Sequence, residues 1–286
     1  MINRPHKIAA VVVLYNPDDD LISNLQSYIN QVDKLYIIDN SDKIIESVIR
    51  KIKSSVPIFY KFNNSNIGIA AALNIGLNES IKEGYDYILT MDQDSSASEL
   101  MVERLYSIIV ASNKNGIVAA DHFNSSVHEK ESIIKTEEIL FTMTSGNLLS
   151  LEAVKTVGDF WEELFIDHVD HEFCLRLNKF GYKVIKTNTT HVHHKLGHLV
   201  KHYLFNHTLW STNHPPIRLY YRFRNRFFVK DRYKKDFPKY IKIDNKNIFF
   251  ELLSIFLFET NRIAKLKMII KGYIHYKNNI FGPYKY

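Results

Sequence analysis

The sequence predicts an α/β fold in which a mainly parallel sheet carries helices on both faces. Short apolar runs that suit strands occur at 8–14, 35–38, 58–62, 87–91 and 117–120. The run 8–14 is apolar throughout, which is typical of a strand buried on both faces. Strands that alternate with single helices favour parallel pairing, because each helix returns the chain to the same edge of the sheet.

Helices are expected around 21–32, 44–52, 69–82 and 98–113, one after each of the first four strands. Asp18 to Asp20 precede the first helix, and Asp is a common helix cap. The Ala-rich stretch 69–82 is followed by Gly84, which would end its helix. A later helix is expected from about 165 to 180, because apolar residues recur there at helical spacing before Gly181.

Length and cysteine content favour a protein of a reducing compartment with either one large domain or one domain plus an appendage. The chain has 286 residues and a single cysteine, Cys174, which cannot form an internal disulfide. No run reaches the roughly 18 consecutive apolar residues that a membrane span needs. The N-terminal apolar run also lacks a small-residue cleavage site, so we interpret it as the first strand.

Charge is distributed unevenly along the chain. Residues 201–286 contain 18 Lys and Arg against 5 Asp and Glu, whereas residues 1–200 contain 19 against 26. An acidic body with a basic, aromatic-rich end suits an enzyme domain that meets an anionic partner: phospholipid, nucleic acid or a lipid diphosphate. We therefore expect a main domain over 1–215 and a basic helical region over 216–286.

Polar residues follow four of the predicted strands. They are Tyr15 and Asn16, Asp39 and Asn40, the loop 66–68, and Asp92 and Asp94. Ligands collect beyond the carboxyl ends of parallel strands, so these clusters predict one binding site along that edge. Each cluster taken alone could equally be a turn or a helix cap.

Asp92 and Asp94 are candidates for a metal site. Alternate residues at an extended strand end point to opposite sides, so the two carboxylates need not bind the same part of a ligand. Hard oxygen ligands suit Mg²⁺ or Mn²⁺, whose shells are usually completed by substrate phosphates. The sequence contains neither a Gly-x-Gly-x-x-Gly fingerprint nor a phosphate-binding loop of the Gly-x-x-x-x-Gly-Lys type, so side chains and a metal would have to manage any phosphates.

Several stretches stand in a characteristic order. They are VVLYNP at 12–17, IIDNS at 37–41, NIG at 66–68, AALNIG at 71–76, MDQD at 91–94, FIDHVDHE at 165–172, HKLG at 194–197 and PIRLYYRFRN at 216–225. This set resembles the nucleotide-sugar domain of family 2 glycosyltransferases, and more narrowly their bacterial rhamnosyltransferase branch. The resemblance covers residues 7 to about 230 and implies a GT-A fold, a Rossmann-like α/β arrangement.

The resemblance assigns a set of residues to the nucleotide sugar: Tyr15, Asn16, Asp39, Asn66, Gly68, Asn74, Asp92 and Asp94. Asp39 would accept a hydrogen bond from the N–H of a pyrimidine base. Asp92 would lie by the ribose, and Asp94 would hold a Mn²⁺ or Mg²⁺ ion that bridges the diphosphate. His194 would complete the metal shell. The other histidines between 191 and 214 are expected to be surface or loop residues, since structural zinc sites usually include cysteine.

The acceptor side is expected in the second half of the main domain. Joining a sugar to a hydroxyl requires a general base, and a carboxylate can serve. Asp170 is our candidate, because it stands six residues before Arg176 as the family's base stands before its arginine. Val169 replaces the commoner Glu, which leaves Asp167 as a rival, and both carboxylates could simply cap the helix. The resemblance also assigns to the acceptor side Ser145, Gly146, Asp167, Arg176 and Arg224.

The basic C-terminal region allows several interpretations. Arg218, Arg222 and Arg226 share one face of a predicted helix beside an aromatic and aliphatic face. Such a helix could lie on a membrane, stack against single-stranded nucleic acid, or pack within the protein. The apolar stretch 248–258 is too short to span a membrane, and it suits either an interfacial anchor or a core helix.

We expect metal-dependent transfer of a sugar with inversion, in one displacement. The resemblance favours L-rhamnose from dTDP-rhamnose, moved to a cell-surface polysaccharide or O-antigen intermediate on a lipid diphosphate carrier. The enzyme would lie peripherally on the inner face of a bacterial membrane, with no nucleic acid expected as a partner. Alternatives are a UDP-sugar donor such as UDP-galactofuranose or a UDP-hexose, a glycoside hydrolase, and a nucleic-acid-binding module that uses the basic aromatic helix.

Overall fold

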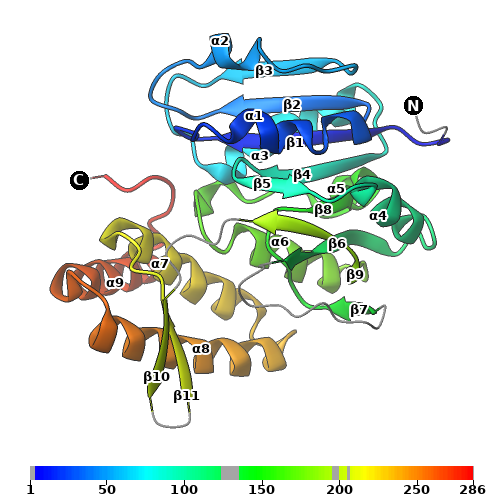
Figure 1. Cartoon of the computed structure of the whole chain (residues 1–286). Helices are drawn as coiled ribbons and strands as arrows, with labels where there is room; N and C mark the ends of the chain where they lie inside the picture. Colours follow the sequence, from blue (N-terminus) through cyan, green and yellow to red (C-terminus); the bar gives the residue numbers. More distant parts are fainter. Residues whose placement is uncertain (1–3, 124–134, 195–199, 205–206, 286) are drawn as a thin grey trace. The chain divides into compact units, whose positions relative to one another are not determined.

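The computed structural model in Figure 1 describes residues 4–123, 135–194, 200–204 and 207–285. The chain forms two compact units. The first comprises Met1–Glu162 and Asp170–Lys195, and the second Glu163–Val169 and Leu196–Tyr286. This division differs from the expected boundary at residue 215, because a hairpin before that residue packs with the C-terminal helices.

The first unit is built on a large sheet. Its N-terminal half has the strand order β3 (Ile58–Phe62), β2 (Lys34–Asp39), β1 (Ile8–Leu14) and β4 (Tyr87–Asp92). These four strands are parallel, as predicted. They are rich in Val and Ile, and the central strand β1 is buried along almost its whole length, which explains its continuous apolar sequence.

The rest of the sheet is mixed. It contains β8 (Asn147–Ser150), β6 (Asn115–Phe123), β9 (Lys183–His194), β5 (Ser95–Ala97) and β7 (Thr136–Ile139). Strand β8 runs antiparallel to both β4 and β6, while β9 is parallel to β6 and antiparallel to β5 and β7. The α/β class is therefore confirmed. Among the described strand pairings of this sheet, four are parallel and four are antiparallel.

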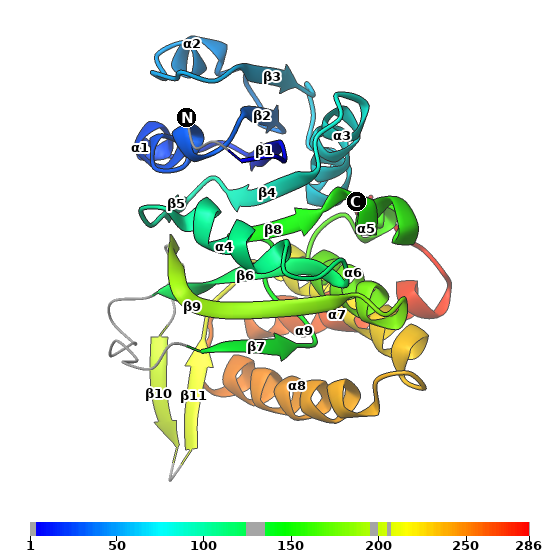
Figure 2. The ribbon, with the colours of Figure 1, turned by 90° about the vertical axis from the view of Figure 1, so that its right-hand side faces the viewer.

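Helices cover both faces of this sheet, as Figure 2 shows for α1 and α3. The helical segments of this part of the chain are α1 (Leu21–Gln26), η1 (Ile29–Gln31), α2 (Glu46–Ile49), α3 (Ile69–Lys82), α4 (Met101–Ile109), α5 (Leu151–Val157), η2 (Glu162–Leu164) and α6 (Val169–Lys179). The helix expected over 21–32 is thus divided, and Asp20 makes no side-chain cap. Gly76 lets α3 approach β1, since a Cβ there would lie 2.4 Å from Cγ2 of Val11.

The second unit contains a hairpin and three helices. These are β10 (Val200–Leu204), β11 (His207–Ser211), α7 (Pro216–Tyr233), α8 (Pro238–Phe258) and α9 (Arg262–Lys277). Their core includes Leu219, Phe223, Ile255 and Ile269. Helix α9 lies close against α7, because Gly272 offers no side chain: a Cβ there would be 2.6 Å from the carbonyl oxygen of Tyr220.

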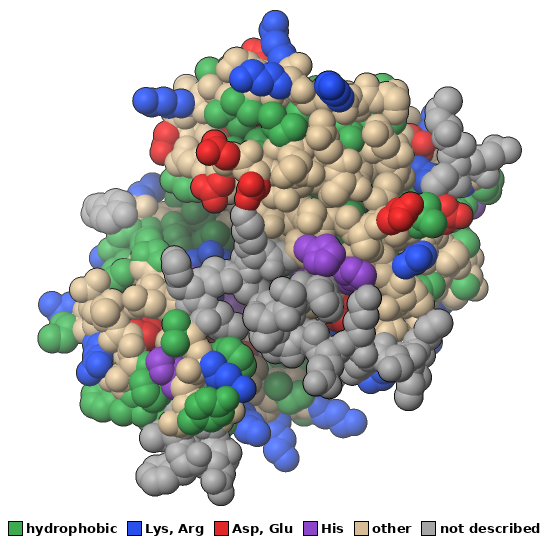
Figure 3. Space-filling model, in the orientation of Figure 1, with side chains coloured by type: hydrophobic (Ala, Val, Ile, Leu, Met, Phe, Trp, Pro, Cys, Tyr) green, Lys and Arg blue, Asp and Glu red, His purple; other side chains and the backbone are tan. Residues whose placement is uncertain are grey.

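The surface of the second unit mixes large apolar and basic side chains, as Figure 3 shows. Phe249 and Phe256 on α8 are 63% and 62% exposed, and Ile263 and Ile270 on α9 are 73% and 58% exposed. Among the residues that the structure describes, no helix combines the length and the apolar character required to cross a bilayer.

Candidate active site

The polar clusters predicted from the sequence lie along one edge of the sheet in the first unit. The register pairs Leu14 with Asp39, Asp39 with Phe62, and Val13 with Asp92. The ends of β1, β2, β3 and β4 therefore fall at the same level, and the residues that follow them form a continuous rim. This arrangement follows from parallel pairing alone.

Gln93 joins the end of β1 to the turn after β4. Its Oε1 accepts a hydrogen bond from the backbone N–H of Tyr15 at 2.7 Å, and its Nε2 donates to the carbonyl of Tyr15 at 3.2 Å. Asn24 donates from Nδ2 to the carbonyl of Gln93 at 3.0 Å. The backbone between Asp92 and Asp94 is thus fixed, while the Tyr15 side chain remains 46% exposed.

Asn16 links the loops after β1 and β2. Its backbone N–H donates to Oγ of Ser41 at 2.8 Å, and its Nδ2 donates to Oδ2 of Asp42 at 2.8 Å. Its Oδ1 accepts from the backbone N–H of Asp42 at 3.1 Å, and its φ of 43° is left-handed, a region that Asn tolerates. Asn16 therefore shapes the rim, and its side-chain amide already has partners within the protein.

Asp39 is fully buried at the end of β2. One carboxylate oxygen accepts the N–H of Ser41 at 2.9 Å, and the other accepts the hydroxyl of Tyr60 at 2.6 Å. Burial, and then the hydrogen bond to Asp39, raise the pKa of Tyr60, so this hydroxyl keeps its proton and remains a donor. A carboxylate has about four lone-pair positions, so Asp39 can still accept an N–H from a ligand.

The loop before α3 is held by its own side chains. The N–H of Gly68 donates to Oδ1 of Asn66 at 2.9 Å, and Nδ2 of Asn40 donates to the carbonyl of Gly68 at 3.2 Å. Gly68 has a φ of 88°, which favours glycine. Asn66 is exposed. The local turn that Asn66 makes supports the helix-entry interpretation, and its exposure is also compatible with a ligand contact.

Asn74 does not have the surroundings expected of a nucleotide contact. It is 3% exposed within α3, donates from Nδ2 to the carbonyl of Phe160 at 2.8 Å and to Glu162 at 2.9 Å, and accepts the N–H of Phe160 at 2.9 Å. The amide of Asn74 is thus hydrogen-bonded within the protein, and its predicted contact with the nucleotide stays a prediction.

Ser145 and Gly146 make hydrogen bonds to the backbone of β4. Ser145 is fully buried, and its Oγ accepts the backbone N–H of Asp92 at 3.1 Å. Gly146, with a φ of 77°, donates to the carbonyl of Thr90 at 2.9 Å, and a Cβ there would lie 2.5 Å from Cγ2 of Val192. Both residues are buried, and their expected acceptor-side role stays a prediction.

The backbone pairing of β5 with β9 places His194 opposite Ser95, the residue that follows Asp94. Directly opposed residues of an antiparallel pair have Cα atoms about 4.5–5.5 Å apart. The main chain of His194 thus lies beside the turn that carries Asp94. The side chain of His194 is outside the described part of the structure, so its predicted metal role stays a prediction.

The donor set at this turn fits a hard divalent cation. Asp92 and Asp94 are separated by a single residue in a hydrogen-bonded turn, and the carboxylate of Asp92 is near enough to Tyr28 to add to the effect of burial in raising the pKa of that phenol. Within the described ranges no group of three or more His, Cys, Asp or Glu is close enough to enclose a metal. One or two carboxylates are what Mg²⁺ or Mn²⁺ uses when substrate phosphates supply other ligands.

Asp170 lies in the first turn of α6, and its Oδ1 accepts the backbone N–H of His171 at 2.8 Å. It is half-buried and lines a cavity of about 10 Å³ together with Thr90, Thr144 and Cys174. Burial raises the pKa of the Cys174 thiol to about 12, so this cysteine is a core residue and no nucleophile.

Asp167 belongs to the second unit and is engaged in ion pairs. Its carboxylate oxygens lie 3.3 Å from Nε of Arg218 and 3.7 Å from Nη2 of Arg222. These contacts give Asp167 structural partners within the second unit. The choice of Asp170 over Asp167 as the base stays a prediction.

Two arginines predicted on the acceptor side have structural surroundings instead. Arg176 donates to the carbonyls of Val157 and Asp159 at 2.8 and 2.7 Å. Arg224 is fully buried and donates to the carbonyls of Gly282 at 2.7 Å and Leu164 at 3.1 Å. These guanidinium groups anchor loops through backbone carbonyls, and the acceptor contacts expected of them stay predictions.

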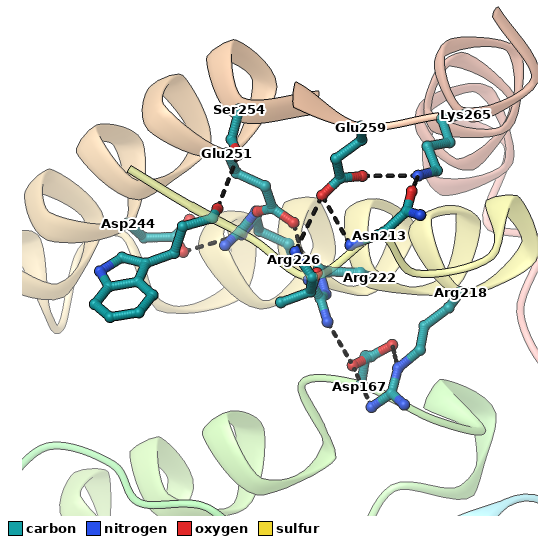
Figure 4. Close-up of polar contacts among 12 residues, drawn as sticks. Asp167, Asn213, Arg218, Arg222, Arg226, Asp244, Glu251, Ser254, Glu259 and Lys265 are labelled. Carbon is teal, nitrogen blue, oxygen red and sulfur yellow. Dashed lines mark hydrogen bonds and ion pairs between the residues drawn. The ribbon is translucent and has the colours of Figure 1, made fainter. Parts of the chain in front are cut away.

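The arginine face of α7 is also committed within the protein (Figure 4). Arg222 donates to Glu251 at 3.0 Å, and Arg226 donates to Asp244 at 3.0 Å and to Glu251. Leu219 and Phe223, on the neighbouring face, are core residues. Helix α7 is therefore a packed helix of the second unit, and neither the membrane-surface nor the nucleic-acid interpretation of its arginines is supported.

Sequence reasoning missed Gln93, Ser41, Asp42 and Tyr60, which hold the rim together. Gln93 could have been found from its position between two aspartates. Tyr60 could have been found from the register of β3, since it lies two residues before the partner of Asp39. The side-chain contacts of the loop residues had no local signal.

Comparison with known proteins identifies the family. The model of the family described as glycosyl transferase family 2 matches residues 9–161, more than half of the chain. A protein named dTDP-rhamnosyl transferase RfbF, from Shigella flexneri, is 28% identical over 243 residues, which cover 78% of this chain and 79% of that protein.

Solved structures agree in fold. A crystal structure of GalNAc-T7 with UDP, GalNAc and Mn²⁺ superposes with a TM-score of 0.60 at 11% identity, covering 82% of this chain and 49% of that one. The structure of TarS from S. aureus gives a TM-score of 0.54 at 11% identity, with coverage of 93% and 43%. The chain thus spans half or less of these proteins, and the likeness concerns the fold. Together with the family match, these findings establish that the chain belongs to glycosyl transferase family 2 and is a glycosyltransferase.

Proposed function

We propose that this enzyme transfers L-rhamnose from dTDP-rhamnose to a bacterial cell-surface glycan on a lipid diphosphate carrier. The observation that carries the proposal is the similarity to a protein named dTDP-rhamnosyl transferase, which extends over 78% of the chain. The donor would lie on the rim formed by the ends of β1, β2, β3 and β4.

The rim residues suit a nucleotide. The exposed ring of Tyr15 offers a face on which a pyrimidine base can stack. Asp39 would accept an N–H of that base, because its carboxylate is oriented by Ser41 and Tyr60. Asn66 would contact the nucleotide from the loop before α3.

Asp94, with His194 as a further proposed ligand, would hold Mn²⁺ or Mg²⁺. Such an ion neutralises charge that develops on the leaving diphosphate. Asp92 would face the ribose side of the donor and Asp94 the diphosphate side, since alternate residues of an extended chain point in opposite directions.

Asp170 would take the proton from the acceptor hydroxyl as that oxygen attacks the anomeric carbon. One displacement inverts the configuration at that carbon and needs no covalent enzyme intermediate. The burial of Cys174 agrees with this scheme, because the only thiol of the chain is unavailable for attack.

A lipid-linked acceptor implies work at a membrane, and we place the contact on α8 and α9. Residues 261–286 contain six Lys and Arg and no Asp or Glu. Exposed apolar residues also occur on these helices, Phe256 on α8 and Ile263 on α9, whereas Lys265 is buried and pairs with Glu259. This combination suits peripheral attachment to an anionic cytoplasmic leaflet.

The donor is tested by transfer itself. The enzyme is incubated with Mn²⁺, a lipid-linked glycan acceptor, and dTDP-rhamnose, UDP-galactofuranose or UDP-galactose in parallel. Metal-dependent transfer is expected from dTDP-rhamnose, with matching stabilisation against thermal unfolding by dTDP. Transfer from a UDP-sugar at a higher kcat/KM would replace rhamnose by the UDP-sugar alternative.

A further inference from the structure

The second unit contains a pocket that has no part in the donor site. It lies between β11, α7 and α8 and has a volume of about 360 Å³. Pockets for small ligands commonly measure about 300–1,000 Å³. The size therefore suits a small molecule or a single unit of a larger one.

One wall of the pocket is aromatic. Trp210 is 39% exposed, and Phe250 and Leu219 lie beside it along the lining. The carbonyl of Trp210 accepts a hydrogen bond from Oγ of Ser254 at 2.8 Å, which fastens β11 to α8. Lys201 Nζ lies 5.7 Å from the centroid of the Trp210 ring, so the indole offers the C–H face of a ligand a flat platform with a cation beside it.

Polar and charged residues also line the pocket: Thr208, Asn247, Arg222 and Glu251. Glu251 accepts hydrogen bonds from Arg222 at 3.0 Å and from Arg226, and Arg226 is held in turn by Asp244 at 3.0 Å (Figure 4). Burial alone would raise the pKa of Glu251, but Arg226 and Arg222 outweigh it and lower that pKa. The carboxylate is therefore an ionised acceptor with a fixed orientation.

The charges around the pocket exclude two ligand classes. Arg222, the cation among the described lining residues, already pairs with Glu251 and Asp167. Glu259, also in the lining, pairs with Lys265 at 2.8 Å. Among the lining residues a phosphate would meet two carboxylates and one arginine that is already paired, and an acyl chain would leave hydroxyl, amide and carboxylate groups without partners. A neutral ligand with one apolar face and several hydroxyls could contact both the apolar and the polar lining residues.

We propose that this pocket is a carbohydrate subsite that holds one pyranose ring of the acceptor glycan. Trp210 lies under the apolar face of the ring, while Asn247, Thr208 and Glu251 bind its hydroxyls. The identification of the ring as part of the acceptor rests on the proposed function. The binding of a sugar here does not.

Binding is measured without donor or catalysis. The chain has two tryptophans, so Trp161→Phe leaves Trp210 as the remaining indole. Its fluorescence is titrated with methyl α-L-rhamnoside, methyl α-D-glucoside and methyl N-acetyl-β-D-glucosaminide, and with inorganic phosphate. A saturable change is expected with at least one glycoside and none with phosphate.

Asn247→Ala in the Trp161→Phe background should weaken glycoside binding by about fivefold, the effect of one lost hydrogen bond. Asn247 is exposed, so this variant should fold normally. The matched control is Asn278→Ala, an exposed asparagine at the end of α9 that should leave binding unchanged. The absence of saturable glycoside binding, or equal binding by Asn247→Ala, overturns the subsite.

Kinetics separates this proposal from the rhamnosyl assignment. In the otherwise unaltered enzyme, Asn247→Ala should raise KM for the glycan acceptor about fivefold and leave kcat and the affinity for dTDP unchanged. Glycoside binding without transfer from dTDP-rhamnose contradicts the donor assignment and leaves the subsite standing. Transfer with an unchanged acceptor KM in Asn247→Ala contradicts the acceptor subsite and leaves the donor assignment standing.

Discussion

Gln93 and Tyr15 exchange two hydrogen bonds across the rim of the sheet, at 2.7 and 3.2 Å. The pair fixes the turn that carries the two aspartates to the strand end that carries the exposed tyrosine. We expect Gln93→Ala to weaken nucleotide binding about five- to tenfold, because two hydrogen bonds that orient the turn are lost. Calorimetric titration with dTDP and Mn²⁺ measures this effect. Gln26→Ala, an exposed glutamine on α1, serves as the control, and equal affinities for both variants would contradict the role of Gln93.

The metal ligand assignment is tested at Asp94. Asp94→Ala should weaken Mn²⁺-dependent binding of dTDP by at least about tenfold, since the proposed carboxylate ligand of the metal is removed. Binding without metal should change little. Asp19→Ala, an exposed carboxylate before α1, should behave as the wild type. Superimposable Mn²⁺ titrations for Asp94→Ala and wild type would refute the assignment.

The choice between the two candidate bases can be made with isosteric variants. Asp170→Asn should lower kcat by about 10²–10⁴-fold, the range expected for a lost general base, with dTDP affinity unchanged. Asp167→Asn should instead lower the free energy of unfolding, by about 1–3 kcal/mol, because Arg218 and Arg222 lose a charged acceptor. Asn tolerates the left-handed φ of 61° at this position. Near-normal turnover by Asp170→Asn would transfer the role to another residue.

The exposed stripe on α9 should mediate membrane attachment. The double variant Ile270→Gln with Ile274→Gln should bind phosphatidylglycerol-containing vesicles at least about tenfold more weakly, as two partly exposed apolar side chains are lost. Vesicle flotation at low and high salt measures the apolar and ionic contributions. The control is Val110→Gln, which alters a 41% exposed residue of the first unit. Unchanged flotation of the double variant would contradict the assignment. So would the finding that the wild type is a dimer and that the double variant is a monomer.

His214 should make stability depend on pH. Burial, followed by the charges of Arg222 and Arg218, lowers the pKa of His214 from 6.5 to about 4. The native state therefore favours the neutral ring, and its contribution is fully present above pH 6.5 and is lost as the pH falls toward 4. Urea unfolding between pH 7 and 4 should show a shallower loss for His214→Gln than for the wild type. Parallel curves would indicate that other groups dominate.

The predictable parts of the fold were those with strong local signals. Strand 58–62 and helix 69–82 were predicted to the residue, because a short run rich in aromatic and β-branched residues and an Ala-rich stretch before Gly84 define them locally. The direction of β8 was not predictable. An apolar run has the same composition whether its neighbours are parallel or antiparallel, so tertiary pairing decides.

The same contrast applies to the site. The rim was predictable because parallel strands align their carboxyl ends, and polar residues after each strand are visible in the sequence. The surroundings of Asn74, Arg176 and Arg224 were not predictable, because a polar residue can face either a ligand or a backbone carbonyl within the protein. Burial distinguishes these cases, and single-sequence patterns do not report it for polar residues.

Gly272 sets the rotation of α9. Its missing side chain admits the carbonyl of Tyr220 at a distance that any other residue would prevent, so this face of the helix must point inward. Successive residues of an α-helix are turned by about 100°, which places Ile263, Ile270 and Ile274 roughly opposite the glycine. A helix turned by even one residue would carry a different set of side chains on its outside. Gly272, a buried residue, therefore determines which side chains of α9 form the outer surface of the helix.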